Sequence, residues 1–214
     1  MKKIGCFLLS LCLAAGMLFS FAACARAPKI DDIRADVIAL VEASYEVNEV
    51  FFGAGLPVLD RTAEEYADLY TFYSSPIVNT YDIVDAAHAK FTSIEEIKAA
   101  ASLVYSPDLL ENNLYVNAFT GYAVSDVGSS VVSSDPLFME DEEHLYQSLS
   151  RTDYLTRGVK IFDYATMRVV RPSSDTAVYV TMDAWYLSDP STVFSARVRL
   201  VSTANGWRLD SLTV

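Results

Sequence analysis

The stretch TAVYVTMDAWYLSDPSTVFSARVRL, residues 176–200, decides the fold, because apolar and polar residues alternate along both of its halves. Successive side chains of a β-strand point to opposite faces of a sheet, so this two-residue period predicts strands that are buried on one face. The residues between the halves, Ser188-Asp-Pro-Ser191, are typical of turns. The stretch therefore predicts an antiparallel hairpin of strands 176–187 and 192–202.

The same alternation continues on both sides of this hairpin. Strands are expected at 159–171 and 207–214, joined to the hairpin by the turn sequences Pro172-Ser-Ser-Asp175 and Thr203-Ala-Asn-Gly206. One face of the resulting meander collects the apolar side chains and is the expected core face. Its members are Ile161, Ala165, Met167, Val169, Val178, Val180, Met182, Ala184, Tyr186, Phe194, Ala196, Val198, Leu200, Trp207 and Leu209.

The opposite face of the meander is charged. If each turn closes as a simple hairpin, Arg168 lies opposite Tyr179, and Asp183 lies opposite Arg197. Arg199 then lies opposite or diagonal to Asp210. Cross-strand pairs of opposite charge contribute roughly 0.2–1 kcal/mol each, so we interpret this face as one that sets the strand register.

A long helix is the clearest prediction for the first half of the chain. From Asp31 onward, one set of positions recurs at spacings of three and four, which is one face of an amphipathic helix that ends at Gly53. These positions are Ile33, Val37, Leu40, Ser44, Val47 and Phe51.

Further elements follow this helix. Thr62-x-x-Glu65 has the form of a capping box and predicts a short helix to residue 70, and either Thr92 or Ser93 can cap a helix over 94–105. Ser106-Pro107 predicts another helix start, over 108–115. Residues 136–149 predict a hairpin that turns at Asp141-Glu142. Helices followed by a meander indicate an α+β fold in which N-terminal helices pack on a curved antiparallel sheet.

The first residues of the chain have the pattern of an export signal. Lys2 and Lys3 precede an uncharged apolar run over 4–23. Phe21-Ala22-Ala23-Cys24 resembles the lipobox of bacterial lipoproteins, in which the cysteine is acylated and becomes the mature N-terminus. This resemblance implies a signal peptide over 1–23, a lipidated tether over 24–30 and one domain over 31–214. Ordinary cleavage after Ala25-Arg26-Ala27 and an uncleaved membrane anchor are the alternatives.

The expected location follows from this leader. The protein is exported and held by acylated Cys24 at the outer surface of the cytoplasmic membrane or in the periplasm, since acyl chains contribute about 0.8 kcal/mol per buried methylene. Cys6 and Cys12 lie in the leader, so the mature chain has one cysteine and neither an internal disulfide nor a cysteine zinc cluster is expected.

The charge of the chain bears on its partners. The formal net charge is −12, and removal of the leader lysines leaves 14 basic and 28 acidic residues with no basic cluster. Phosphate backbones require a basic footprint, so we expect no nucleic-acid partner. The acidic surface favours solubility or contact with a cationic partner, and the polar outer face of the sheet predicts a monomer.

The order of elements also points to a family. Together with the terminal sequence NGWRLDSLTV, residues 205–214, it resembles the NTF2-like (cystatin-like) α+β domains, whose last strand often carries Gly-Trp followed by Arg or Lys. The resemblance implies a cone-shaped pocket between helices and sheet, used by some members for isomerase or dehydratase chemistry and by many for binding. The long 53–90 connection departs from the family pattern, and no catalytic residue is carried over.

The candidate site residues are few. Asp163 interrupts the apolar face, so it either occupies a polar pocket, with Tyr186 and Trp207 lining the same cavity, or meets water where the strand curls outward. His88 follows Asp85 at a spacing of three, which can orient an imidazole, and His144 lies in an expected turn. The acidic run 140–143 lacks calcium-loop spacing, so no metal or cofactor is expected.

Two classes of function are compatible with these residues. The favoured one is a non-enzymatic, membrane-anchored lipoprotein domain that binds a small ligand or an envelope protein. The alternative is a small-molecule pocket enzyme of the isomerase, dehydratase or hydrolase type, with Asp163 or His88 as general base. An enzyme needs an ionisable group close to a second polar group in one cavity, whereas a binding domain is expected to have an apolar one.

Overall fold

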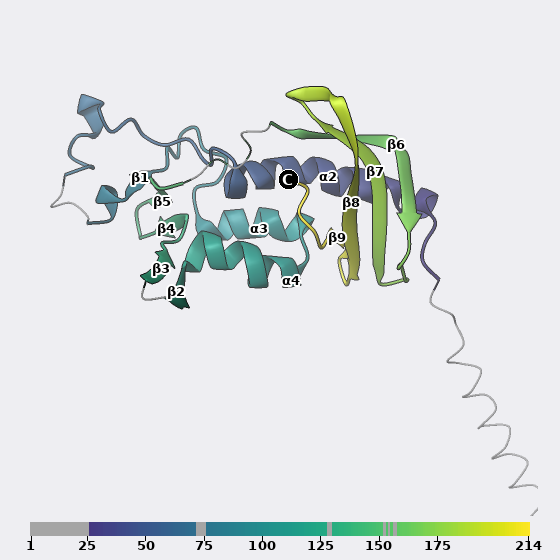
Figure 1. Cartoon of the computed structure of the whole chain (residues 1–214). Helices are drawn as coiled ribbons and strands as arrows, with labels where there is room; N and C mark the ends of the chain where they lie inside the picture. Colours follow the sequence, from purple (N-terminus) through teal and green to yellow (C-terminus); the bar gives the residue numbers. More distant parts are fainter. Residues whose placement is uncertain (1–25, 72–75, 128–129, 152, 154, 156–157) are drawn as a thin grey trace, which may run out of the picture.

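The computed structural model describes residues 26–71, 76–127, 130–151, 153, 155 and 158–214. Helix α2, Ile30–Phe52, is the longest helix of the described residues and confirms the expected amphipathic helix (Figure 1). The buried side chains recur along one of its faces at the predicted spacing. They are Ile33, Val37, Leu40, Val41, Ser44, Val47, Asn48, Val50 and Phe51.

A four-stranded antiparallel sheet packs across the N-terminal part of α2 (Figure 1). Its strands are β6 (Lys160–Val170), β7 (Ala177–Tyr186), β8 (Asp189–Thr203) and β9 (Gly206–Leu209), in that order. The alternating positions of β7, β8 and β9 are buried against the helices, as the sequence period predicts. These residues are Val178, Val180, Met182, Ala184, Ala196, Val198, Leu200 and Leu209. The α+β class is confirmed.

The register of the sheet differs from the simple hairpin register on two of the three strand pairs. Thr181 lies opposite both Arg168 and Arg197, so neither Tyr179 nor Asp183 has the expected partner. Two features cause this in the second hairpin: β8 begins at Asp189, directly after a short turn, and the register shifts again between Tyr186 and Ala184. Asp183 therefore pairs with Ser195 in place of Arg197.

The third expected pair is confirmed. The side chains of Arg199 and Asp210 form an ion pair, and the Asp210 backbone N–H donates to the Arg199 carbonyl over 2.7 Å. Ser106, which caps α4, also donates its hydroxyl hydrogen to the Asp210 carboxylate. The carboxyl group of Asp210 therefore joins the last strand to the helical layer.

Strand β6 contains a bulge between Asp163 and Arg168. Phe162 and Met167 are both buried, at 6% and 5% exposure, although Met167 is the fifth residue after Phe162 and a regular strand would place the two on opposite faces. An additional residue in one strand moves the following side chains to the other face. The prediction that Ile161 and Ala165 face the core is therefore wrong, because Ala165 is exposed and Phe162 occupies the core instead.

The chain leaves the sheet earlier than expected. The last strand was predicted to reach residue 214 but ends at Leu209, and the final residues return to α2. Thr213 is only 2% exposed, and its hydroxyl oxygen lies 2.7 Å from the Ser44 hydroxyl. Asp210 and Ser211 still form hydrogen bonds with Arg199 of β8, whereas the buried hydroxyl of Thr213 is satisfied by α2.

Two further helical segments follow the prediction, with one extension. Helix α3, Ile94–Val104, begins at Ser93, whose hydroxyl accepts the Glu96 N–H over 3.2 Å. Helix α4, Pro107–Leu109, is capped by Ser106 and continues through the wider turns η3 (Leu110–Leu114) and η4 (Val116–Thr120). The helical stretch therefore ends five residues later than the predicted 115.

The segment after α2 is less regular than predicted. The helix expected from Thr62 is a single 3₁₀ turn, η1 (Glu64–Tyr66). The Thr62 N–H donates to the Asp60 carboxylate over 2.8 Å, and not to Glu65 as the capping box requires. A second turn, η2 (Pro76–Asn79), leads into β1 (Tyr81–Ile83), a strand that the sequence does not predict.

A second sheet lies beyond the C-terminal end of α2 (Figure 1). The predicted hairpin over 136–149 is present as β4 (Phe138–Glu140) and β5 (Leu145–Ser148), and β1 pairs with the other edge of β5. Another hairpin, β2 (Tyr122–Val127) with β3 (Ser130–Ser134), was not predicted.

Arg151 links this second sheet to the end of α2. Its guanidinium donates to the carbonyl of Gly53 over 2.7 Å and to the carbonyl of Val50. The last carbonyl groups of a helix have no hydrogen-bond partner within the helix, and a positive charge is favourable at this end. A distant arginine thus caps α2, which has no basic residue in its own last turn.

Candidate functional site

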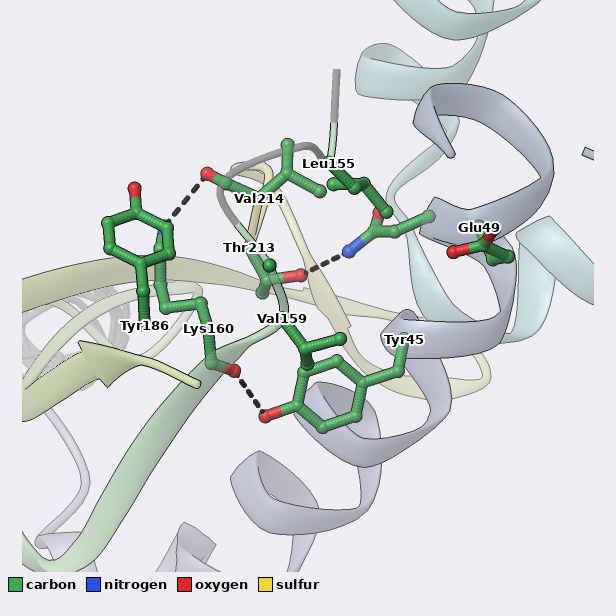
Figure 2. A pocket seen from close by; sticks show the side chains of 10 residues that line it. Tyr45, Glu49, Leu155, Val159, Lys160, Tyr186, Thr213 and Val214 are labelled. Atoms are coloured by element: carbon green, nitrogen blue, oxygen red, sulfur yellow. Dashed lines mark hydrogen bonds between the residues drawn. The ribbon is translucent and has the colours of Figure 1, made fainter. Parts of the chain in front are cut away.

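A cavity of about 150 Å³ lies between α2, the start of β6 and the last residues of the chain (Figure 2). A cavity of roughly this volume in a protein core can hold one benzene ring. The residues that line it come from four separate segments. They are Tyr45, Asn48, Glu49, Leu155, Gly158, Val159, Lys160, Tyr186, Thr213 and Val214.

A buried hydrogen-bond network forms one wall of this pocket. The Tyr105 hydroxyl donates to Asn48 Oδ1 over 2.6 Å, and Asn48 Nδ2 donates to the Thr213 hydroxyl oxygen over 2.7 Å. Ser44 contacts the same threonine and donates to the carbonyl of Val41 over 2.6 Å. Buried polar groups are costly unless they are paired, so this network fixes the chain end against α2.

Lys160 and Tyr45 form the polar part of the opposite wall. Lys160 Nζ donates to the main-chain oxygen of Val214 over 2.8 Å, and the Tyr45 hydroxyl donates to the Lys160 carbonyl over 2.8 Å (Figure 2). Burial lowers the pKa of Lys160 from its usual value, because a low-dielectric environment disfavours the charged ammonium. Burial also raises the pKa of Tyr45, with a smaller contribution from the charge of Glu42.

Of the three residues that were expected to share a cavity, only Tyr186 lines this pocket. Asp163 lies on the outer face of the sheet, at the bulge, where its carboxylate accepts the Ala165 N–H over 2.9 Å. Trp207 is partly buried and packs against the main core from β9, opposite Ser202. The structure does not bring the three side chains together, because the bulge turns Asp163 away from the core.

The Asp85–His88 pair does form. His88 Nδ1 lies 2.6 Å from the Asp85 carboxylate, and this hydrogen bond is the main reason that the pKa of Asp85 is lowered. However, the imidazole is 76% exposed on a turn, and neither residue lines a described pocket. A general base acts on a positioned substrate, and the described residues around His88 provide no such position.

His144 lies in the β4–β5 turn, next to Asp141. Partial burial favours the neutral form of Asp141, but a 2.6 Å hydrogen bond from the Tyr146 hydroxyl and two backbone N–H groups lower its pKa on balance. The carboxylate of Asp141 is therefore used to hold the turn. Among the described residues, no group of three or more His, Cys, Asp or Glu side chains is arranged to hold a metal ion.

Cys24, the expected lipidation site, lies outside the described residues, and Ala27 and Pro28 lead from there into α2. None of the helices in the described part of the chain combines the length and apolar character needed to cross a lipid bilayer.

Nine of the ten lining residues were not predicted from the sequence, among them Tyr45, Lys160 and Thr213. One signal was present, because Ser44 and Asn48 are polar residues on the apolar face of α2 and lie one helical turn apart. Polar residues on a buried face require partners, and this requirement indicates a polar contact at the middle of the helix. The partner, Thr213, could not be identified by spacing.

The fold and the pocket define an α+β domain with a small, mainly apolar cavity beside α2. Comparison of the chain with protein-family models, with curated proteins and with solved structures finds no match.

Proposed function

We propose that this protein is a membrane-anchored extracytoplasmic lipoprotein whose α+β domain binds a small ligand in the pocket between Tyr45, Lys160 and Tyr186. The pocket itself carries the proposal: its volume of about 150 Å³ suits a ring-sized group, and aliphatic and aromatic side chains make up most of its wall. The proposed general bases Asp163 and His88 both lie outside it. A binding function is therefore favoured over the enzymatic alternative.

The ionisable groups of the pocket support the same choice. Burial is the cause of the lowered pKa of Lys160, and no neighbouring carboxylate contributes to it. Glu49, an acidic residue of the pocket wall, accepts the Ala54 N–H over 2.9 Å at the end of α2. Acid–base catalysis needs groups that act on the same atom or on adjacent ones, and these two are directed to different partners.

An NTF2-like arrangement is part of the proposal. Its support is the order of elements and the position of the long helix against an antiparallel sheet that ends in the Gly206–Leu209 strand. In such an arrangement the pocket between helix and sheet is the usual place for a ligand, and the pocket described above lies between α2 and β6.

The membrane anchor is tested by Cys24→Ser. We expect this variant to move from the membrane fraction to the soluble fraction or to retain its leader, because it removes the lipobox thiol to which the proposed acyl chains are attached. Cys6→Ser is the matched control and is expected to stay in the membrane. Mass spectrometry of the N-terminus is the second measurement. A mature chain that begins at Pro28, or a retained leader in the unsubstituted protein, would contradict lipidation.

The pocket is tested with benzyl alcohol, a neutral ring that matches its size. We expect binding in the millimolar range, since roughly 0.5 kcal/mol for each of about eight non-hydrogen atoms gives about 4 kcal/mol. Amide chemical shifts of Lys160, Tyr186 and Thr213 report it in NMR spectra. Val159→Trp fills the pocket and should weaken binding at least tenfold, whereas Val193→Trp, on an exposed part of β8, should not. Equal binding to both variants would place the ligand elsewhere.

A further inference from the structure

We infer that the pocket selects a small carboxylic acid with one ring-sized apolar group, and that Lys160 holds its carboxylate. This inference rests on the proposed binding function and specifies the chemical class of the ligand. It follows from three properties of the described pocket residues: the unused hydrogen-bonding capacity of the lysine, the direction of the Glu49 carboxylate, and the apolar character of the remaining wall.

The first property concerns the donors of Lys160. An ammonium group has three N–H donors, and the hydrogen bond to the Val214 oxygen uses one of them. Among the described residues, no other hydrogen bond and no ion pair with an aspartate or glutamate involves this ammonium. The remaining donors belong to a side chain that lines the cavity, so a ligand oxygen can accept them.

The second property is electrostatic. Burial disfavours the charged form of Lys160, as the direction of its pKa shift indicates, and an anion in contact with the ammonium offsets that cost. Among the described lining residues, Glu49 is the one with a carboxylate side chain, and Figure 2 shows it on the side away from Lys160. It is engaged by the Ala54 N–H, so it does not neutralise the lysine.

The third property is the nature of the remaining wall. The cavity is surrounded by Val159, Leu155 and the rings of Tyr45 and Tyr186 (Figure 2). Its volume suits a ligand whose apolar part is a single ring. Asn48 and Thr213 are hydrogen-bonded to each other. Recognition of a charged head group therefore depends on Lys160, and recognition of the rest of the ligand depends on apolar contact.

The inference is tested by comparing benzoate, benzyl alcohol and benzylamine, which share one ring and differ in charge. The mature protein in detergent micelles is titrated with each at pH 7.5, and amide shifts of Lys160 and Thr213 give the affinities. We expect benzoate to bind at least tenfold more tightly than benzyl alcohol, and benzylamine to bind more weakly than both. A charge-assisted hydrogen bond of about 1.5–3 kcal/mol gives a factor of this size.

Substitutions locate the selectivity. Lys160→Met should remove the preference of the pocket for benzoate over benzyl alcohol, and the dispersion of its amide NMR spectrum shows whether the variant is folded. Lys160→Arg should keep part of the preference, because it keeps the charge. Lys98→Met removes an exposed lysine outside the pocket and should change neither affinity. All variants experience the same partitioning of the probes into micelles.

The possible outcomes separate the two proposals. If the three probes bind equally to the unsubstituted protein, the preference for an acid is wrong while the binding function stands. If benzoate is preferred but Lys160→Met keeps the preference, another group holds the anion and the role of Lys160 is wrong. If none of the probes shifts the pocket amides, the binding function itself fails. Should Lys160→Met not fold, the order of affinities in the unsubstituted protein decides the preference for an acid, and Lys160→Gln replaces it as the test of the lysine.

Discussion

Leu200→Ala should destabilise the protein by about 3 kcal/mol, within the roughly 2–5 kcal/mol typical of a fully buried leucine. Leu200 is 0% exposed in the centre of the four-stranded sheet, and its partners across the strands are Val178 and Leu209. The substitution removes apolar contacts and leaves a cavity that the surrounding strands only partly fill. Urea unfolding, followed by the fluorescence of Trp185 and Trp207, measures the change in the free energy of unfolding.

The matched control is Leu187→Ala in the same sheet. Leu187 is 64% exposed in the β7–β8 turn, so this substitution should change the free energy of unfolding by less than about 0.5 kcal/mol. Equal effects of the two substitutions, or a larger effect at Leu187, would contradict the placement of Leu200 in the core.

Asn48→Ala should have a comparable effect, about 2–4 kcal/mol, for a different physical reason. It removes the acceptor of the Tyr105 hydroxyl and the donor to Thr213, both of which are buried. An unsatisfied buried polar group costs roughly 1–3 kcal/mol, and here two partners lose a hydrogen bond at once. Asn113→Ala, at an exposed position of η3, is the control and should be close to neutral.

A double-mutant cycle separates this network from simple loss of volume. Tyr105→Phe removes the other partner, so in the Asn48→Ala background it should cost less than it does alone, with a coupling energy of about 1 kcal/mol. Additive effects would show that the 2.6 Å contact contributes little to stability. The same unfolding experiments provide this measurement.

The regular elements could be predicted because their signals are local. The alternation along β7 and β8 and the three-and-four spacing along α2 depend only on which side chains avoid water, and both predictions are confirmed. Ser93 and Ser106 are confirmed as caps for the same reason, since the N–H groups that they satisfy lie within three residues along the chain.

Other features could not be predicted because their causes lie far away in the chain. Strand β1 spans three residues, too few to show a period, and it exists because β5 offers an open edge more than sixty positions later. No residue pattern in the sequence marks the bulge in β6. It depends on how the strand pairs with β7 and packs against α2. Asp163 was misplaced for this reason.

The sequence by itself determined which segments form α2 and the β7–β8 hairpin and which of their faces are apolar, because burial of apolar surface follows from residue periods alone. Only the tertiary structure decided the pocket. Tyr45, Lys160 and Thr213 belong to three distant segments, and they meet because the bulge in β6 and the return of the chain end to α2 bring them together. Such contacts depend on packing and on the pairing of buried polar groups, which no local pattern records.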